Sequence, residues 1–368
     1  MSRFSASAVG ADETIACSGP CCGVSRRGFF KTFAAAGAAS AIPAVSLPAF
    51  AQQPPAGKRR VIDVHHHYFP QAFKDSSGRE GPLPPFVRDW SSARMLEEMD
   101  KNNIEKSVLS LASVPIGWFR MKPDELRPLM RTMNEEGAKL VQDNKGRHGL
   151  FAWVSCSDVE GSLREITYAF DTLKADGIEM STSFGDKWPG DPAFTPVFEE
   201  LNRRKAIVYF HPLAPFCCGN LVTGVQDSWI EYPYDSGRAI LSLLFNGALA
   251  KFRDIKWIFS HSGGALPYLS HRVDWQSRPV KNIKEIAPDG VLAEFKRLHY
   301  ETANAASAPA IAGLLKLVPV SQVMYGSDFP YVTSQYNLAN LRGNGLSEDD
   351  LKAIEYVNAE KLIPALKG

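Results

Sequence analysis

The sequence lacks a dominant charge of either sign. Its 41 Lys and Arg residues balance 40 Asp and Glu residues, which leaves a formal net charge of +1. Proteins that bind nucleic acid or anionic membrane surfaces usually carry a strong positive excess, so we expect neither partner here. The hydrophobic content of 45% and the charged content of 22% are ordinary for a soluble globular protein with an apolar core.

Cysteine is also scarce, with six residues in 368. Three of them lie in the export signal described below, so Cys156, Cys217 and Cys218 remain. Three cysteines cannot all pair within one chain, and the neighbours Cys217 and Cys218 do not pair easily. Buried, inert thiols are the expected state. A disulfide between Cys156 and Cys217 is the alternative in an oxidising compartment.

Residues 1–51 have the pattern of an export signal that is removed from the mature protein. A twin-arginine motif, Ser-Arg-Arg-Gly-Phe-Phe-Lys, spans residues 25–31, and a weakly apolar, Ala-rich stretch spans 32–47. Ala49-Phe50-Ala51 then gives the small-x-small pattern that signal peptidase cleaves. Prolines at 43 and 48 disfavour the alternative of an uncleaved membrane anchor. We therefore predict a periplasmic protein, without stable membrane insertion after cleavage, whose fold comprises residues 52–368.

Short apolar runs alternate with helical patterns through the rest of the chain. The runs are rich in Val, Ile, Phe and Tyr, and their length suits buried parallel strands. We predict strands at 60–67, 104–111, 148–155, 177–181, 206–211, 255–261, 298–302 and 323–328. Helices are predicted at 92–101, 127–142, 162–174, 194–204, 236–252 and 347–357. Pro128 is expected in the first turn of its helix, and Ser347 is expected as an N-cap.

Eight strands that alternate with helices predict an α/β fold, the (β/α)₈ TIM barrel. The length fits either two average domains or one such barrel, and no linker-like segment divides residues 52–368. The alternative is an open, doubly wound sheet. That fold usually carries a Gly-rich phosphate loop after its first strand, where this chain has His65, His66 and His67.

Metal-type side chains close four of the predicted strands. They lie in Asp63-Val64-His65-His66-His67, Phe210-His211-Pro212, Ser260-His261-Ser262 and Gly326-Ser327-Asp328. The carboxyl ends of barrel strands converge on one mouth, so these side chains can share one pocket. Alternate residues of a strand share a face, so His65 and His67 face the pocket and His66 faces away. Imidazole and carboxylate ligands suit zinc, with manganese as the alternative.

The four motifs, together with Gly263-Gly264 and Phe329-Pro330, resemble those of the amidohydrolase superfamily. Within it, they are similar to the branch of aminocarboxymuconate-semialdehyde decarboxylase and related aromatic-acid decarboxylases. The resemblance covers essentially all of residues 52–368. It implies that one divalent metal ion is held by His65, His67, His211 and Asp328. It also implies that His261 is the acid/base residue.

Three substrate-binding residues are implied as well. Trp188 resembles a pocket-lining Trp of the family. Arg272 resembles an Arg that reaches the substrate carboxylate of the neighbouring subunit, which implies a homodimer. The family's other substrate-binding Arg lies between the first two strands, where Arg79, Arg88 and Arg94 compete, and Arg88 is our candidate.

The fourth strand lacks the Lys that is carbamylated to bridge two metal ions in other branches of the superfamily. It begins Gly-Ile-Glu-Met at residue 177, which favours one ion unless Glu179 faces the lumen and bridges. The remaining histidines are expected to be structural. His66 should pack between the sheet and its helices, and His148 and His299 are not expected to be ligands.

The resemblance implies a metal-dependent, non-oxidative decarboxylase of an aromatic or enol-type carboxylic acid. The imidazole of His261 would exchange the proton that replaces CO₂. A lactonase-like hydrolase on the same site is the alternative, and periplasmic location favours it somewhat. The segment 236–247 resembles the corresponding segment of decarboxylase members, and this resemblance favours the decarboxylase over the hydrolase. A non-catalytic metal-binding protein would have no use for the acid/base His261.

Overall fold

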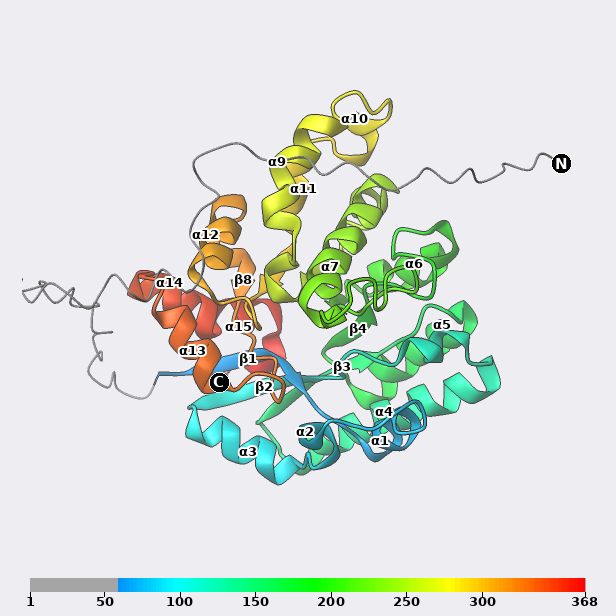
Figure 1. Ribbon diagram of the computed structural model, residues 1–368, viewed down its shortest axis with the longest axis vertical. Coiled ribbons are helices and arrows are strands. Elements are labelled where there is room, and N and C mark those ends of the chain that lie inside the picture. The colour runs from blue at the N-terminus through cyan, green and yellow to red at the C-terminus, as the bar shows by residue number, and fades with distance from the viewer. Residues whose placement is uncertain (1–58, 368) are drawn as a thin grey trace, which may run out of the picture. The chain divides into compact units, whose positions relative to one another are not determined.

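The computed structural model describes residues 59–367. The predicted export signal lies outside these residues and stays a prediction. Eight parallel strands follow one another in chain order around a single sheet (Figure 1). They are β1 (Val61–His67), β2 (Ile104–Ser110), β3 (His148–Trp153), β4 (Gly177–Ser181), β5 (Ile207–His211), β6 (Lys256–Phe259), β7 (His299–Glu301) and β8 (Val323–Met324).

The last strand returns to the first. The backbone N–H of Val64 donates to the carbonyl of Tyr325 at 3.0 Å, and His66 forms a parallel bridge with Phe329. These contacts join the segment after β8 to β1 and close the ring. The predicted (β/α)₈ barrel is therefore confirmed, and the open doubly wound sheet is wrong.

The helices surround the strands, and α7 and α9 run side by side at one edge of the barrel mouth (Figure 1). The helices before that pair are α1 (Gln71–Ser77), α2 (Pro85–Arg88), α3 (Ser92–Lys101), α4 (Pro123–Asp143), α5 (Val159–Tyr168) and α6 (Thr195–Arg203). The pair and the remaining helices are α7 (Asp227–Phe245), α8 (Ala248–Lys251), α9 (Leu266–Ser277), α10 (Ile283–Ile286), α11 (Val291–Arg297), α12 (Ala308–Leu317), α13 (Ser334–Arg342), α14 (Glu348–Lys352) and α15 (Asn358–Leu362). Among the described residues, no helix is both long and apolar enough to cross a membrane.

Three helix starts differ from the prediction by three residues or more, and the first is that of α5, which begins at Val159 rather than at residue 162. Helix α4 begins at Pro123, whose missing N–H suits a first turn, so Pro128 lies inside the helix instead. Helix α7 begins at Asp227 rather than at residue 236, and it includes Pro233. It ends before Gly247, whose φ of 76° is a left-handed conformation that glycine adopts without strain. The early start of α7 matters because its first turns reach the mouth of the barrel. Ser347 is the predicted N-cap and accepts a hydrogen bond from the N–H of Asp350.

Buried side chains form two clusters. The smaller one takes inward-facing residues from six strands and closes against the C-terminal segment, and it contains Ile62, Val64, Val108, Phe151, Ile207, Tyr209, Ile258, Met324, Ala359, Ile363 and Leu366. Because side chains alternate along a strand, these residues fill the barrel interior. The larger cluster lies between the sheet and the helices. Side chains thus fill the barrel interior, and a reaction site can form only at the mouth of the barrel.

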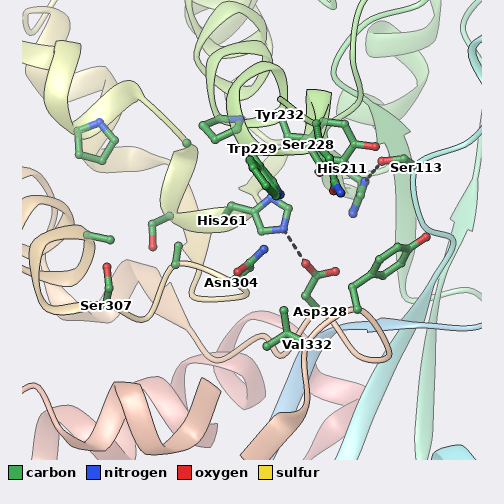
Figure 2. A pocket seen from close by; sticks show the side chains of 18 of the residues that line it. Ser113, His211, Ser228, Trp229, Tyr232, His261, Asn304, Ser307, Asp328 and Val332 are labelled. Carbon is green, nitrogen blue, oxygen red and sulfur yellow. Dashed lines mark hydrogen bonds and ion pairs between the residues drawn. The ribbon is translucent and has the colours of Figure 1, made fainter. Parts of the chain in front are cut away.

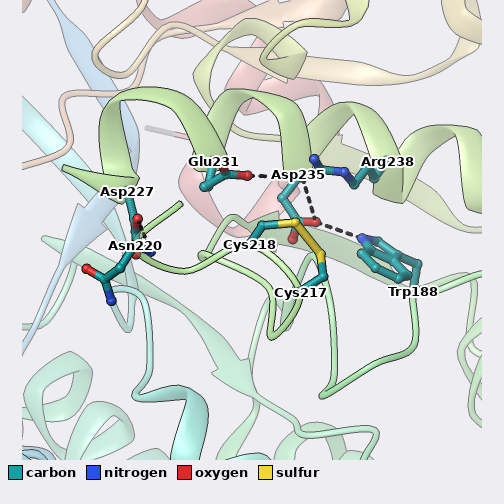
Figure 3. Close-up of a disulfide and its surroundings, with 8 residues drawn as sticks. All are labelled: Trp188, Cys217, Cys218, Asn220, Asp227, Glu231, Asp235 and Arg238. Atoms are coloured by element: carbon teal, nitrogen blue, oxygen red, sulfur yellow. Dashed lines mark hydrogen bonds and ion pairs between the residues drawn. A yellow bond between two sulfur atoms is a disulfide. The ribbon is translucent and has the colours of Figure 1, made fainter. Parts of the chain in front are cut away.

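The expectation of buried thiols is wrong for Cys217 and Cys218 and is confirmed for Cys156. Cys217 and Cys218 form a disulfide in the loop between β5 and α7 (Figure 3). Cys156 is a buried, unpaired thiol whose pKa is raised by burial. Its Sγ faces the core, 4.0 Å from Sδ of Met180, and so it does not pair with the loop.

Candidate active site

The five predicted metal-type residues meet at the mouth of the barrel. One nitrogen or oxygen atom each of His65, His211, His261 and Asp328 lies within 4.8 Å of the corresponding atoms of the other three. His67 adjoins this group, with its Nε2 2.9 Å from Nε2 of His65 and 3.1 Å from Oδ1 of Asp328. Residues that are up to 263 positions apart in the chain therefore share one small site, as the strand-end pattern predicted.

The end of β1 orients its three histidines as predicted. The pairing of β1 with β2 shifts register between Asp63 and His66. His65 and His67 face the site, whereas the His66 ring stacks on Phe329 with the ring centroids 5.0 Å apart. His66 Nδ1 also lies 2.8 Å from Oδ2 of Asp63. His66 is thus a buried structural residue.

The proposed ligand rings are oriented by hydrogen bonds on their far sides. His65 Nδ1 lies 2.8 Å from Oε1 of Glu301, and His211 Nδ1 lies 2.9 Å from the carbonyl oxygen of Pro212. A carboxylate and a carbonyl only accept, so Nδ1 is assigned the proton in both rings, and Nε2 is the ring atom directed toward the site. The buried Nε2 atom of His211 has no hydrogen-bond partner in residues 59–367, and that of His261 has only an ion-pair contact with Asp328 at 3.4 Å.

Orphaned buried nitrogens are costly, and a bound cation would satisfy them. The donors are imidazole nitrogens and carboxylate oxygens, which are the atoms that zinc and manganese bind. The residues present therefore fit a divalent metal ion.

The electrostatics of the site also favour a cation. Burial alone would lower the pKa of His65, but the carboxylates of Glu301 and Asp328 outweigh it and raise this pKa to about 10. Burial lowers the pKa of His67 and of His211. Burial also disfavours the charged form of Asp328, yet contacts with the histidines hold its pKa well below the usual range. One carboxylate is thus shared by several rings, and a metal ion would replace the proton on His65.

Glu179 faces the lumen but is engaged elsewhere. It lies in register with Tyr209 of the barrel interior, and its Oε2 accepts a hydrogen bond from the N–H of Leu111 at 2.6 Å. Burial raises the pKa of this carboxyl group well above its ordinary value, which favours the neutral form. A neutral carboxyl group is a poor bridge between metal ions.

A cavity of about 880 Å³ opens above the metal-type residues (Figure 2). Of the metal-type residues, His211, His261 and Asp328 line it. The walls are mainly aromatic and other apolar side chains, among them Phe86, Trp229, Tyr232, Pro233, Tyr268, Tyr331 and Val332. Ser113, Ser228, Asn304 and Ser307 add neutral polar groups. Among the described residues, neither Lys nor Arg lines the cavity.

The three predicted substrate-binding residues lie outside this cavity. The Nε1–H of Trp188 donates to Oδ1 of Asp235 at 2.7 Å, beside the disulfide loop (Figure 3). Arg88 of α2 has a 63% exposed side chain and pairs with Asp89 at 2.7 Å. Arg272 is exposed on α9. Within one subunit, the structure therefore brings none of them to the reacting centre.

The aromatic wall residues and Glu301 were missed in the sequence. The wall residues lie on the short helix α2, on the early turns of α7 and α9 and on the loop after β8, where no periodic pattern marks them. Glu301, by contrast, closes a predicted strand in the same way as the metal-type residues do, and that position is a signal that could have identified it.

Comparison with known proteins identifies the family. The amidohydrolase family model matches residues 62–365, and the chain belongs to this family. The 6-methylsalicylic acid decarboxylase of Penicillium expansum is 29% identical over 317 residues, covering 83% of this chain and 97% of that protein. The 6-methylsalicylic acid decarboxylase acuB of Aspergillus aculeatus is 32% identical over 278 residues, covering 73% of this chain and 84% of that protein.

A solved structure supports the same relationship at the level of the fold. The 5-carboxyvanillate decarboxylase of Novosphingobium aromaticivorans, complexed with manganese and 4-hydroxy-3-methoxy-5-nitrobenzoic acid, has a TM-score of 0.72 and 21% sequence identity. The match covers 83% of this chain and 96% of that chain. The predicted resemblance to amidohydrolases and their aromatic-acid decarboxylases is confirmed.

Proposed function

We propose that this chain is a metal-dependent, non-oxidative decarboxylase of an aromatic carboxylic acid. The observation that carries the proposal is a cluster of four imidazoles and a carboxylate, from His65, His67, His211, His261 and Asp328, beside an aromatic-walled cavity. The curated relatives above are decarboxylases of a phenolic aromatic acid, and their likeness spans most of both chains. The cavity walls suit a flat, apolar ring, and the floor suits its acidic substituents.

One divalent ion would be held by His65, His67, His211 and Asp328. The nitrogen-rich ligand set favours zinc, and metal analysis of the purified protein would distinguish zinc from manganese, the ion in the related structure. When bound, the ion orients substrate oxygens and stabilises negative charge. His261 is the most exposed of the four rings: its side chain is 11% exposed, whereas those of His65 and His67 are 0% exposed and His211 is 5% exposed. That position suits a residue that exchanges protons with substrate and solvent.

The chain's own residues supply the proton. His261, protonated, donates from its ring to the carbon that bears the carboxylate. The bond between that carbon and the carboxylate then breaks, its electron pair returns to the ring system, and CO₂ leaves. Asp328 Oδ2 lies 3.4 Å from Nε2 of His261, so the carboxylate adjoins the ring that transfers the proton. His261 takes up a new proton from solvent, so each turnover consumes one proton and changes no oxidation state of the protein.

The direct test is CO₂ release by metal-loaded protein from hydroxybenzoates, starting with 6-methylsalicylate. We expect stoichiometric CO₂ and the matching phenol, and no CO₂ after chelation of the metal. Ring-opened acid from a lactone panel, without CO₂ from any aromatic acid, would instead establish the hydrolase.

Arg272 of a partner subunit is proposed to hold the substrate carboxylate. The cavity has no Lys or Arg of its own in the part of the chain that the structure describes. Arg272 is exposed on α9, the helix whose first turn carries the cavity residues Pro267 and Tyr268. Tyr268 is 90% exposed and Trp275 is 62% exposed, which leaves an apolar surface around Arg272 that a second copy would cover.

A mixing experiment tests this shared site. Arg272→Ala and His261→Ala homodimers are each expected to be nearly inactive. After subunit exchange, a mixed dimer has one site with both His261 and Arg272 intact, so about a quarter of wild-type activity should return. No recovery on mixing, with exchange verified by mass spectrometry, would place the required groups in one subunit.

Periplasmic location is proposed from the export signal in residues 1–51. The Cys217–Cys218 disulfide is consistent with an oxidising compartment.

A further inference from the structure

Glu301 is a buried carboxylate at the end of β7 that does not line the cavity. Its Oε1 lies 2.8 Å from Nδ1 of His65 and accepts a hydrogen bond from the backbone N–H of His261 at 2.8 Å. Its Oε2 accepts from the N–H of Ala303 at 2.5 Å. We infer that Glu301 is a positioning residue that aligns a metal ligand and the acid/base residue at once, an inference that rests on the proposed roles of His65 and His261.

The first half of this role concerns the His65 ring. A carboxylate that accepts from Nδ1 fixes the tautomer, stops rotation of the ring, and makes Nε2 a better electron donor to a cation. His65 and Glu301 are both 0% exposed, so solvent cannot supply this contact in place of the carboxylate.

The second half concerns the backbone of His261. His261 has a φ of 52° and Ser262 a φ of 58°, a left-handed conformation that residues other than glycine rarely adopt. Such a conformation persists only where the surroundings fix it. The N–H of His261 is the first donor of this turn, and it is bound by Glu301. The carboxylate therefore holds the backbone that aims the His261 ring into the cavity.

The backbone at Gly326 packs so closely against the Glu301 carboxylate that a side chain has no room there. A Cβ at Gly326 would overlap Oε2 of Glu301 and would lie 2.7 Å from Cβ of His65. Only glycine at this position lets the segment after β8 pass behind both side chains. The close approach of the Glu301 carboxylate thus explains why the Gly326-Ser327-Asp328 motif begins with glycine.

A neighbouring carboxylate has a different function. Asp63 accepts from the backbone N–H groups of His65 and Ser327, both at 3.0 Å, and contacts the ring of His66. It joins β1 to the segment after β8. In residues 59–367, Glu301 is the carboxylate that contacts both the His65 ring and the His261 backbone.

The test measures metal binding and does not depend on catalysis. Metal-free wild type, Glu301→Gln and Glu294→Gln are titrated with Co²⁺ in competition with a chromophoric chelator. Gln keeps the size of Glu, but its NH₂ group cannot accept from the N–H donors that the second carboxylate oxygen serves. We expect the cobalt dissociation constant of Glu301→Gln to rise about 10- to 100-fold. The visible absorption bands of the saturated cobalt protein should also change, which reports altered ligand geometry.

Glu294→Gln is the matched control. Glu294 is equally buried and pairs with Arg253 at 2.7 Å and with Arg297 at 2.9 Å, on α11 away from the site. It should lose stability without loss of cobalt affinity. If Glu301→Gln does not fold, Gly326→Ala keeps the charge but displaces the carboxylate, and it should show the same loss.

Cobalt affinity and spectrum equal to those of Glu294→Gln, in whichever of the two site variants folds, would overturn the positioning role. Because no substrate is present, this result is independent of whether the wild type releases CO₂.

Discussion

Replacing His261 by Ala is expected to abolish CO₂ release while the metal stays bound. Proton transfer by a positioned side chain contributes about 10²- to 10⁴-fold to a rate, so kcat should fall by that factor. The loss should appear in kcat rather than in KM, because the ring acts on the substrate after it is bound. Steady-state CO₂ release and metal analysis of the same sample give the two measurements.

A histidine at the other end of the barrel provides the control. His299 opens β7, and burial lowers its pKa to about 4. Its replacement by Gln should leave kcat and metal content unchanged. The alternative is that His261 itself binds the metal, because one of its ring nitrogens lies within 4.8 Å of the ligand atoms of His65, His211 and Asp328. If His261→Ala emerges without metal, His261 is a ligand, and the proton donor must be another group.

The sequence was most informative where local pattern and fold geometry coincide. Each strand of a barrel is short and apolar, and its carboxyl end points to one mouth. Hence His65, His67, His211, His261 and Asp328 could be brought together before any coordinates were known. The period of two along β1 also distinguished His66 from its neighbours correctly.

Features that depend on loop conformation or on distant contacts could not be predicted in the same way. The Cys217–Cys218 bond depends on the local backbone of one loop, which carries no periodic signal. The position of Trp188 depends on its hydrogen bond to Asp235, a residue 47 positions away on α7. In α4, Pro123 occupies the first turn that was predicted for Pro128, because either proline suits that position and only the packing of the preceding segment distinguishes them.

Substrate recognition was the least predictable part of the site. The aromatic wall comes from α2, from the first turn of α9, from the loop after β8 and from the early turns of α7. The predicted helix start at residue 236 excluded that part of α7. Arg272 cannot be assigned within one subunit, since its proposed function depends on a second copy. Both gaps have one physical cause: strand ends are fixed by the barrel, whereas loop and subunit contacts are set by tertiary and quaternary packing.

Replacing Asp328 by Ala is expected to remove the metal ion and, with it, all measurable decarboxylation. Asp328 is the carboxylate shared by the histidines, 3.1 Å from His67 and 3.4 Å from His65. Loss of a group behind a ligand typically weakens metal binding about 10- to 100-fold, so loss of a ligand should exceed 100-fold. Metal content after dialysis and the cobalt dissociation constant measure this effect.

Thermal unfolding adds a readout that needs no substrate. A metal ion present at about 100 times its dissociation constant stabilises the folded protein by about 2.7 kcal/mol, so chelation should lower the Tm of the wild type. The Asp328→Ala variant should show no such shift. Asp235→Asn is the matched control, because Asp235 is buried and bonded to Trp188, outside the metal group. A metal-dependent Tm shift that survives in Asp328→Ala would show that the histidines alone bind the ion and that Asp328 is not a required ligand.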